Sequence, residues 1–68
     1  MTYKELSTLT EGKSFPLAAE NEDGERVIIE VGANEGGRFF RVTTAQNNDW
    51  YRIETIWEDG FREEAYSK

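Results

Sequence analysis

The chain contains neither cysteine nor histidine. Without cysteine, no disulfide or thiolate ligand can stabilise the fold, so stability must come from apolar packing or from a partner subunit. Without histidine, the chain lacks the commonest general base and the commonest zinc ligand, and a metal site would need oxygen ligands alone. We therefore expect a non-enzymatic protein with no catalytic residues, no cofactor and no metal site.

Long apolar runs are also missing. No stretch approaches the roughly 20 apolar residues of a membrane-spanning helix, and Met1–Glu5 lacks the basic and apolar regions of a secretory signal. With 68 residues, the chain is near the lower limit of what folds unaided. We expect a single domain over residues 1–68, located in the cytoplasm and without a membrane partner.

Positive charge is scarce, because 8 Lys and Arg side chains stand against 14 Asp and Glu side chains and give a net charge of -6. An acidic chain repels phosphate backbones, which argues against nucleic-acid binding unless the basic groups gather on one face. The acidic residues concentrate around residues 20–25 and 58–64. We interpret them as solvated charge that aids solubility, at opposite ends of a sheet.

β-branched and aromatic residues dominate what remains, and the strongest strand signal is Trp50–Trp57, which has turn residues on both sides. The alternation of apolar residues predicts four further strands, at residues 15–19, 25–31, 38–45 and 61–66. Pro16 predicts that the first of them lies at an edge. Thr2 and Glu5 have the spacing of a capping box, which predicts a short N-terminal helix that docks through Leu6 and Leu9, and the alternative is an irregular N-terminal arm.

The turn residues predict how the strands pair. A three-residue loop ending at Gly24 places Leu17 opposite Ile29 and Glu20 opposite Arg26. A glycine-rich turn is expected over residues 32–37. A two-residue turn at Asn47-Asn48 places Val42 opposite Ile53 and Arg41 opposite Glu54. For the turn at Asp59-Gly60, loops of two and three residues are both compatible with the sequence.

These elements predict a mainly β (α+β) fold: a five-stranded antiparallel meander with a short N-terminal helix, as an open sheet or a small barrel. One face is expected to form the core because it gathers large apolar side chains. Its members are Phe15, Leu17, Ala19, Val27, Ile29, Val31, Phe40, Val42, Tyr51, Ile53 and Trp57.

The opposite face is expected to be the functional surface, because it is apolar where a solvated sheet face should be polar. Its candidate partner-binding residues are Ile28, Phe39, Arg41, Trp50, Arg52 and Ile56. An apolar patch bordered by arginine is typical of a protein interface. We expect a protein partner, or a second copy of the chain as a homodimer, although barrel closure or cover by the helix would bury the same residues.

Two other functions are compatible with the same features. Aromatic and arginine side chains interleaved on a sheet also bind single-stranded nucleic acids, but Glu30 and Glu54 would weaken the positive potential there. The acidic turns would suit an inhibitor that docks on a basic enzyme surface, with an affinity that falls as salt rises.

Overall fold

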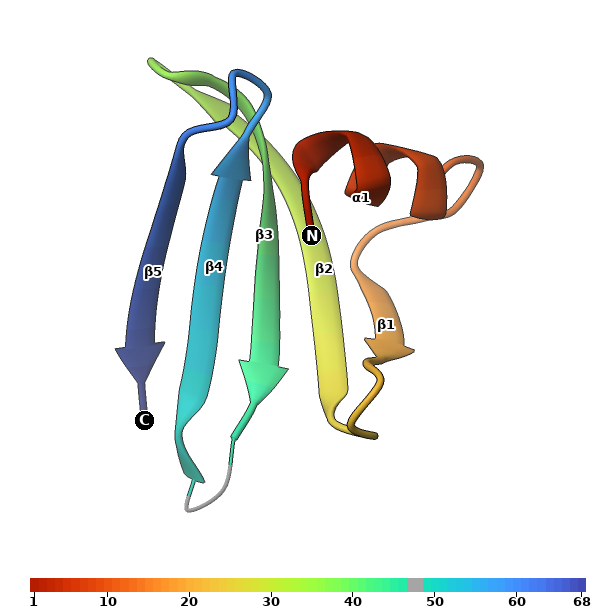
Figure 1. The fold of residues 1–68 in the computed structure, drawn as a ribbon, viewed down its shortest axis with the longest axis vertical. Helices are drawn as coiled ribbons and strands as arrows, with labels where there is room; N and C mark the ends of the chain where they lie inside the picture. The colour runs from red at the N-terminus through yellow and green to blue at the C-terminus, as the bar shows by residue number, and fades with distance from the viewer. Residues whose placement is uncertain (47–48) are drawn as a thin grey trace.

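The computed structural model of the protein describes residues 1–46 and 49–68. One helix, α1 (Tyr3–Leu9), precedes β1 (Leu17–Glu20), β2 (Arg26–Asn34), β3 (Gly37–Ala45), β4 (Tyr51–Trp57) and β5 (Arg62–Ser67). The five strands form one open antiparallel sheet in the order β1-β2-β3-β4-β5 (Figure 1). The predicted meander with an N-terminal helix is confirmed. No helix in the described part of the chain is long and apolar enough to cross a membrane.

Helix α1 begins at the predicted capping box. The Thr2 hydroxyl accepts a hydrogen bond from the Glu5 backbone N–H, and the Thr2 backbone N–H donates to Glu5 Oε1, both at 3.1 Å. The backbone N–H of Thr2, and next its hydroxyl, hold the pKa of Glu5 below its ordinary value. The cap therefore satisfies one donor at the helix start and one at the residue that precedes it.

The cap predicts two effects on stability. Thr2→Ala removes an acceptor from the helix N-terminus and should lower the free energy of unfolding by about 1 kcal/mol in urea titrations.

The lowered pKa of Glu5 means that the ionised Glu5 carboxylate stabilises the folded protein at neutral pH. This stabilisation is lost as the pH falls below 4.5 and through the lower pKa of the folded state. Glu5→Gln should therefore flatten the acid limb of the stability curve.

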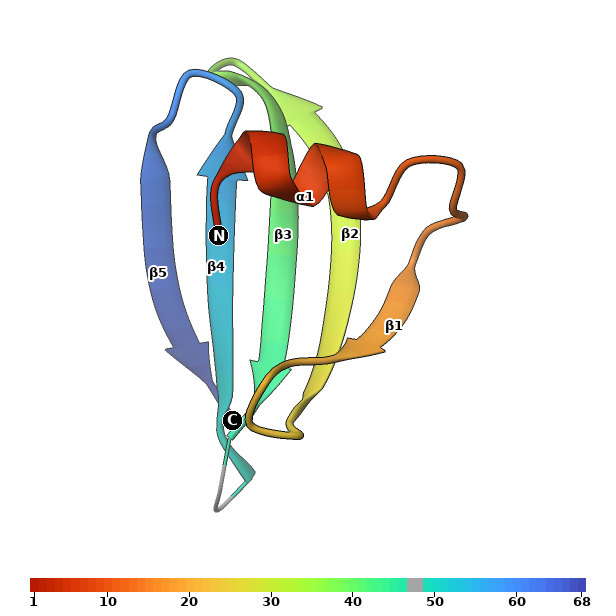
Figure 2. The ribbon, with the colours of Figure 1, turned by 45° about the vertical axis from the view of Figure 1, so that its right-hand side comes forward.

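The helix crosses one face of the sheet, which we call the covered face (Figure 2). Leu6 is fully buried there, and Thr10 is buried beside it. The ring of Tyr3 lies 4.9 Å from that of Phe40. Docking through Leu6 is thus confirmed, but docking through Leu9 is wrong, because Leu9 is 48% exposed. Tyr3, Leu6 and Thr10 share the stripe that faces the sheet, and Leu9 falls beside it.

Two hairpin loops follow the three-residue pattern. In the β1–β2 connection, Gly24 has a positive φ and its N–H donates to the Asn21 carbonyl at 3.0 Å, so the predicted pairing of Leu17 with Ile29 is confirmed. In the β4–β5 connection, the Gly60 N–H donates to the Trp57 carbonyl at 3.0 Å. This selects the three-residue loop, and hence the register of β5.

The pairing of β3 with β4 differs from the prediction by one residue. Val42 lies opposite Glu54 instead of Ile53, and Arg41 lies opposite Thr55 instead of Glu54. The predicted turn at Asn47-Asn48 lies outside the described residues, but the Gln46 N–H donates to the Trp50 carbonyl at 2.8 Å. Three residues therefore separate the paired positions. A shift of one residue moves every side chain of β4 to the other face of the sheet.

The turn between β2 and β3 is shorter than the predicted glycine-rich segment. Strand β2 continues to Asn34, and Asn34 pairs with Gly37. Gly32 is therefore a strand residue, and it lies opposite Phe39. A Cβ atom added at Gly32 would come within 2.5 Å of the Phe39 ring. The glycine leaves the room that this ring needs, which is a packing requirement and not a turn requirement.

The core lies between α1 and the covered face. Its buried cluster consists of Leu6, Val27, Ile29, Phe40, Val42 and Ile56, with Tyr3 and Leu17 packed against it. The prediction that Tyr51, Ile53 and Trp57 point into this core is wrong, because the register of β4 turns them to the opposite face. Phe15 and Val31, also predicted for the core, are 37% and 50% exposed. One short helix is too small to cover the whole face.

Candidate functional site on the open face of the sheet

The structure divides the six candidate residues between the two faces of the sheet. Ile28, Phe39 and Arg41 share the face opposite α1. Ile56 lies on the covered face, where it is 2% exposed and belongs to the core. Arg52 lies on the covered face too, with its guanidinium 3.5 Å from Glu54. Trp50 precedes β4, is 43% exposed and has the Lys68 ammonium 5.5 Å from its ring centroid.

The face opposite α1, which we call the open face, has no described element over it (Figures 1 and 2). The pairing aligns its side chains in four rows that run across the strands, and the row at the β1–β2 loop end of the sheet contains Glu20, Arg26, Ala45, Tyr51 and Ser67. The aromatic row is Gly32, Phe39, Trp57 and Phe61; the charged row is Glu30, Arg41, Thr55 and Glu63; the apolar row is Ala18, Ile28, Thr43, Ile53 and Ala65.

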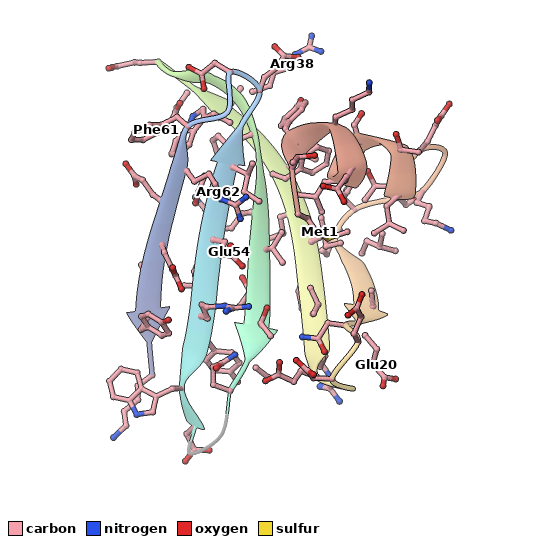
Figure 3. The ribbon with its side chains drawn as sticks, viewed as in Figure 1. Met1, Glu20, Arg38, Glu54, Phe61 and Arg62 are labelled. Carbon is pink, nitrogen blue, oxygen red and sulfur yellow. The ribbon has the colours of Figure 1, made fainter. Side chains whose placement is uncertain are left out.

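The aromatic row is held by contacts between its own rings. The Trp57 centroid lies 5.6 Å from that of Phe39 and 5.4 Å from that of Phe61, at tilted angles that suit aromatic pairs. The Trp57 indole N–H donates to Asn34 Oδ1 at 3.0 Å, and the same oxygen accepts the Gly36 N–H at 2.9 Å. Trp57 is therefore only 8% exposed, while Phe61, at the upper end of β5 in Figure 3, is 58% exposed.

The large apolar and aromatic open-face residues that the sequence analysis did not assign to the functional surface are Tyr51, Ile53, Trp57 and Phe61. The signal that would have found them is the length of the β3–β4 connection. Asp49 has φ +66°, the same left-handed conformation that Gly24 and Gly60 adopt at the ends of their three-residue loops. Aspartate adopts this conformation at a modest cost in free energy, but it is a weaker sequence signal for a turn than glycine is.

Arg41 is the cation of the charged row, and its surroundings differ from the prediction. Glu54 does not neutralise it, because Glu54 lies on the covered face and bonds Arg62 at 2.8 Å. Instead, Arg41 lies opposite Glu30 on the neighbouring strand, and its guanidinium carbon lies 5.5 Å from the centroid of the Phe39 ring. This distance is within the range of a cation–π contact.

The open face carries little of the acidity of the chain. Glu20, Glu30 and Glu63 against Arg26 and Arg41 leave its four rows with a net charge of -1, compared with -6 for the whole protein. The described acidic residues gather instead at the β1–β2 and β4–β5 loops, which lie at opposite ends of the sheet as predicted (Figure 1). A nearly neutral surface adds little local repulsion to the approach of another protein, and the repulsion that remains comes from the acidic residues elsewhere on the chain.

The open face presents aromatic rings, aliphatic side chains, threonine hydroxyls, the carboxylates of Glu20, Glu30 and Glu63, and the guanidinium groups of Arg26 and Arg41. Among residues 1–46 and 49–68, no group of three or more acidic side chains is placed to hold a metal ion. No protein-family model, no curated protein and no solved structure matches this chain, so its function has to be argued from this geometry.

Proposed function

We propose that the protein is a small cytoplasmic, non-enzymatic interaction module whose open face packs against the open face of a second copy. The observation that carries the proposal is the aromatic and apolar rows on a sheet face that no described element covers. A five-stranded sheet with one solvated face normally places polar side chains there. Covering the rows with protein removes their apolar surface from water, which is the main favourable contribution to association.

The charged row suits a second copy as the partner. A two-fold axis parallel to the strands and passing between β2 and β3 would bring Arg41 of each copy opposite Glu30 of the other. One favourable pair would then occur twice, as a symmetric interface requires. On the same axis, apolar rows would meet each other, because such a rotation keeps each row at its own height along the strands.

The proposal predicts a dimer whose association depends on the open face. Ile28→Arg places a charge in the apolar row and should give a monomer by sedimentation equilibrium, with the circular dichroism spectrum unchanged. Val31→Arg is the matched control, because Val31 is on the same strand, on the covered face and 50% exposed. It should remain a dimer. A wild-type chain that stays monomeric at the highest soluble concentration would exclude the proposal.

A charge swap tests the proposed pair directly. Arg41→Glu alone and Glu30→Arg alone each place like charges together and should weaken the dimer, whereas the double variant should restore it.

Raising the salt concentration should strengthen association, because screening reduces the repulsion between two copies that each carry a net charge of -6.

Single-stranded nucleic acid is the competing ligand for the same rings, because Phe39 and Phe61 could stack bases. A titration with a short oligonucleotide at low salt distinguishes the two. Quenching of tryptophan fluorescence that weakens as salt rises would replace the dimer proposal with nucleic-acid binding. We expect no quenching, because Glu30 lies beside Arg41 in the charged row and Glu63 adds a second carboxylate at the far end of that row.

A further inference from the structure

A second surface feature lies on the covered face, between α1 and the β1–β2 hairpin. It is a hollow of about 370 Å³ whose floor is formed by Val27 and Ile29 and whose sides are formed by Met1, Leu9 and Ala19. Met1 and Leu9 are 57% and 48% exposed although both are apolar. We call this hollow the acidic groove, because Glu20, Asn21, Glu22 and Asp23 of the hairpin complete its lining.

Both sides of the groove are held in place. On the helix side, Arg62 Nη1 donates to the Met1 carbonyl at 2.7 Å, and the same guanidinium bonds Glu54 at 2.8 Å (Figure 3). On the hairpin side, Asn21 Oδ1 accepts the backbone N–H groups of Asp23 and Glu25 at 3.0 and 2.9 Å. The groove is therefore largely formed before a partner arrives, which lowers the entropic cost of binding.

Carboxylates outnumber cations in the lining of the groove, where Glu20, Glu22 and Asp23 stand against the α-amino group of Met1. Glu20, Glu22 and Asp23 take part in no salt bridge within the described chain, where the only two recorded involve Glu54. Arg62, which donates to the Met1 carbonyl, is paired with Glu54, and neither Arg62 nor Lys4 of α1 belongs to the lining of the groove. An anionic ligand such as a phosphate or an acidic peptide would be repelled, whereas lysine or arginine would be attracted.

We propose that the acidic groove binds a short cationic peptide segment of a partner protein. An apolar side chain of that segment would lie over Val27 between Leu9 and Ala19, and flanking lysine or arginine residues would pair with Glu22 and Asp23. The groove and the open face lie on opposite sides of the sheet, so this binding neither requires nor prevents association of two copies.

The test uses a fluorescent synthetic peptide, acetyl-KRKLLKRK-amide, and fluorescence polarisation at low salt. We expect saturable binding that is about tenfold weaker for KRKGGKRK, because the leucines supply the buried apolar area. The acidic counterpart, EDELLEDE, should not bind. Equal affinity for the leucine and glycine peptides would overturn the proposal, since it would mean attraction by net charge alone.

Variants of the protein then locate the site. Glu22→Gln with Asp23→Asn should weaken KRKLLKRK binding by about three- to tenfold, whereas Glu63→Gln with Glu64→Gln, which changes the net charge equally, should change it by less than about twofold. Leu9→Ser should weaken binding with the fold intact by circular dichroism, because Leu9 is exposed. Ile28→Arg on the open face should leave it unchanged. Equal losses for both carboxylate pairs would place binding elsewhere.

Discussion

Ile56→Ala should lower the free energy of unfolding by about 2–5 kcal/mol, whereas Ile53→Ala should lower it by less than about 1 kcal/mol. Ile56 is 2% exposed within the core cluster, so its truncation leaves a cavity under α1. Ile53 is on the open face and only partly buried. A domain of this size has a total stability of only about 5–15 kcal/mol, and the Ile56 variant should therefore unfold at a much lower urea concentration.

This pair of variants tests the register of β4, because the same substitution, isoleucine to alanine, is made at two positions of that strand. The two isoleucines lie three residues apart on the same strand and therefore point to opposite faces. Urea titrations followed by tryptophan fluorescence and by circular dichroism should give coincident transitions for both variants. If Ile53→Ala lowers the free energy of unfolding more than Ile56→Ala does, a two-residue turn connects β3 and β4. The residues of β4 would then exchange places between the open face and the core.

The second large effect is expected at the helix. Leu6→Ala should lower the free energy of unfolding by about 2–5 kcal/mol, because Leu6 is the largest fully buried side chain of the described chain and joins α1 to the core. A seven-residue helix is not stable in water by itself, so its docking supplies most of its stability. The variant should lose helical signal at lower urea concentrations than wild type.

Leu9→Ala is the matched control for Leu6→Ala. It makes the same change in the same helix, but Leu9 is 48% exposed, so the loss should stay within about 0.5 kcal/mol. If the two variants lose equal stability, α1 packs through a different stripe, and the acidic groove beside Leu9 would have a different shape. If neither loses stability, the sheet folds independently of the helix.

The two proposed surfaces depend on different parts of the molecule. The open face depends on the pairing of β3 with β4, which brings Trp57 beside Phe39 at 5.6 Å. The acidic groove depends on the packing of α1 and on the β1–β2 hairpin. Failure of the dimer experiment would leave the peptide experiment intact, and the reverse also holds. Together the open face and the acidic groove would allow one copy to bind a second copy and a cationic partner at the same time.

Local chemistry was enough to determine several features from the sequence. The capping box of Thr2 and Glu5 depends on residues three positions apart, and it forms as predicted. The loop ending at Gly24 needs a left-handed residue at a defined position, and glycine supplies it. The first hairpin and the meander follow, because a short loop forces neighbouring strands to pair.

Only the tertiary structure decided which face of β4 is covered. This strand has apolar residues at both odd and even positions, with Tyr51, Ile53 and Trp57 on one face and Ile56 on the other, so its pattern does not select a register. The choice depends on a connection ended by Asp49, and on Trp57 finding Asn34 as a partner 23 residues away. Similarly, the sequence alone makes Gly32 look like a turn residue, and only the pairing with Phe39 shows that this glycine makes room for a ring. Contacts between residues distant in sequence, which periodicity does not encode, therefore set the composition of both faces.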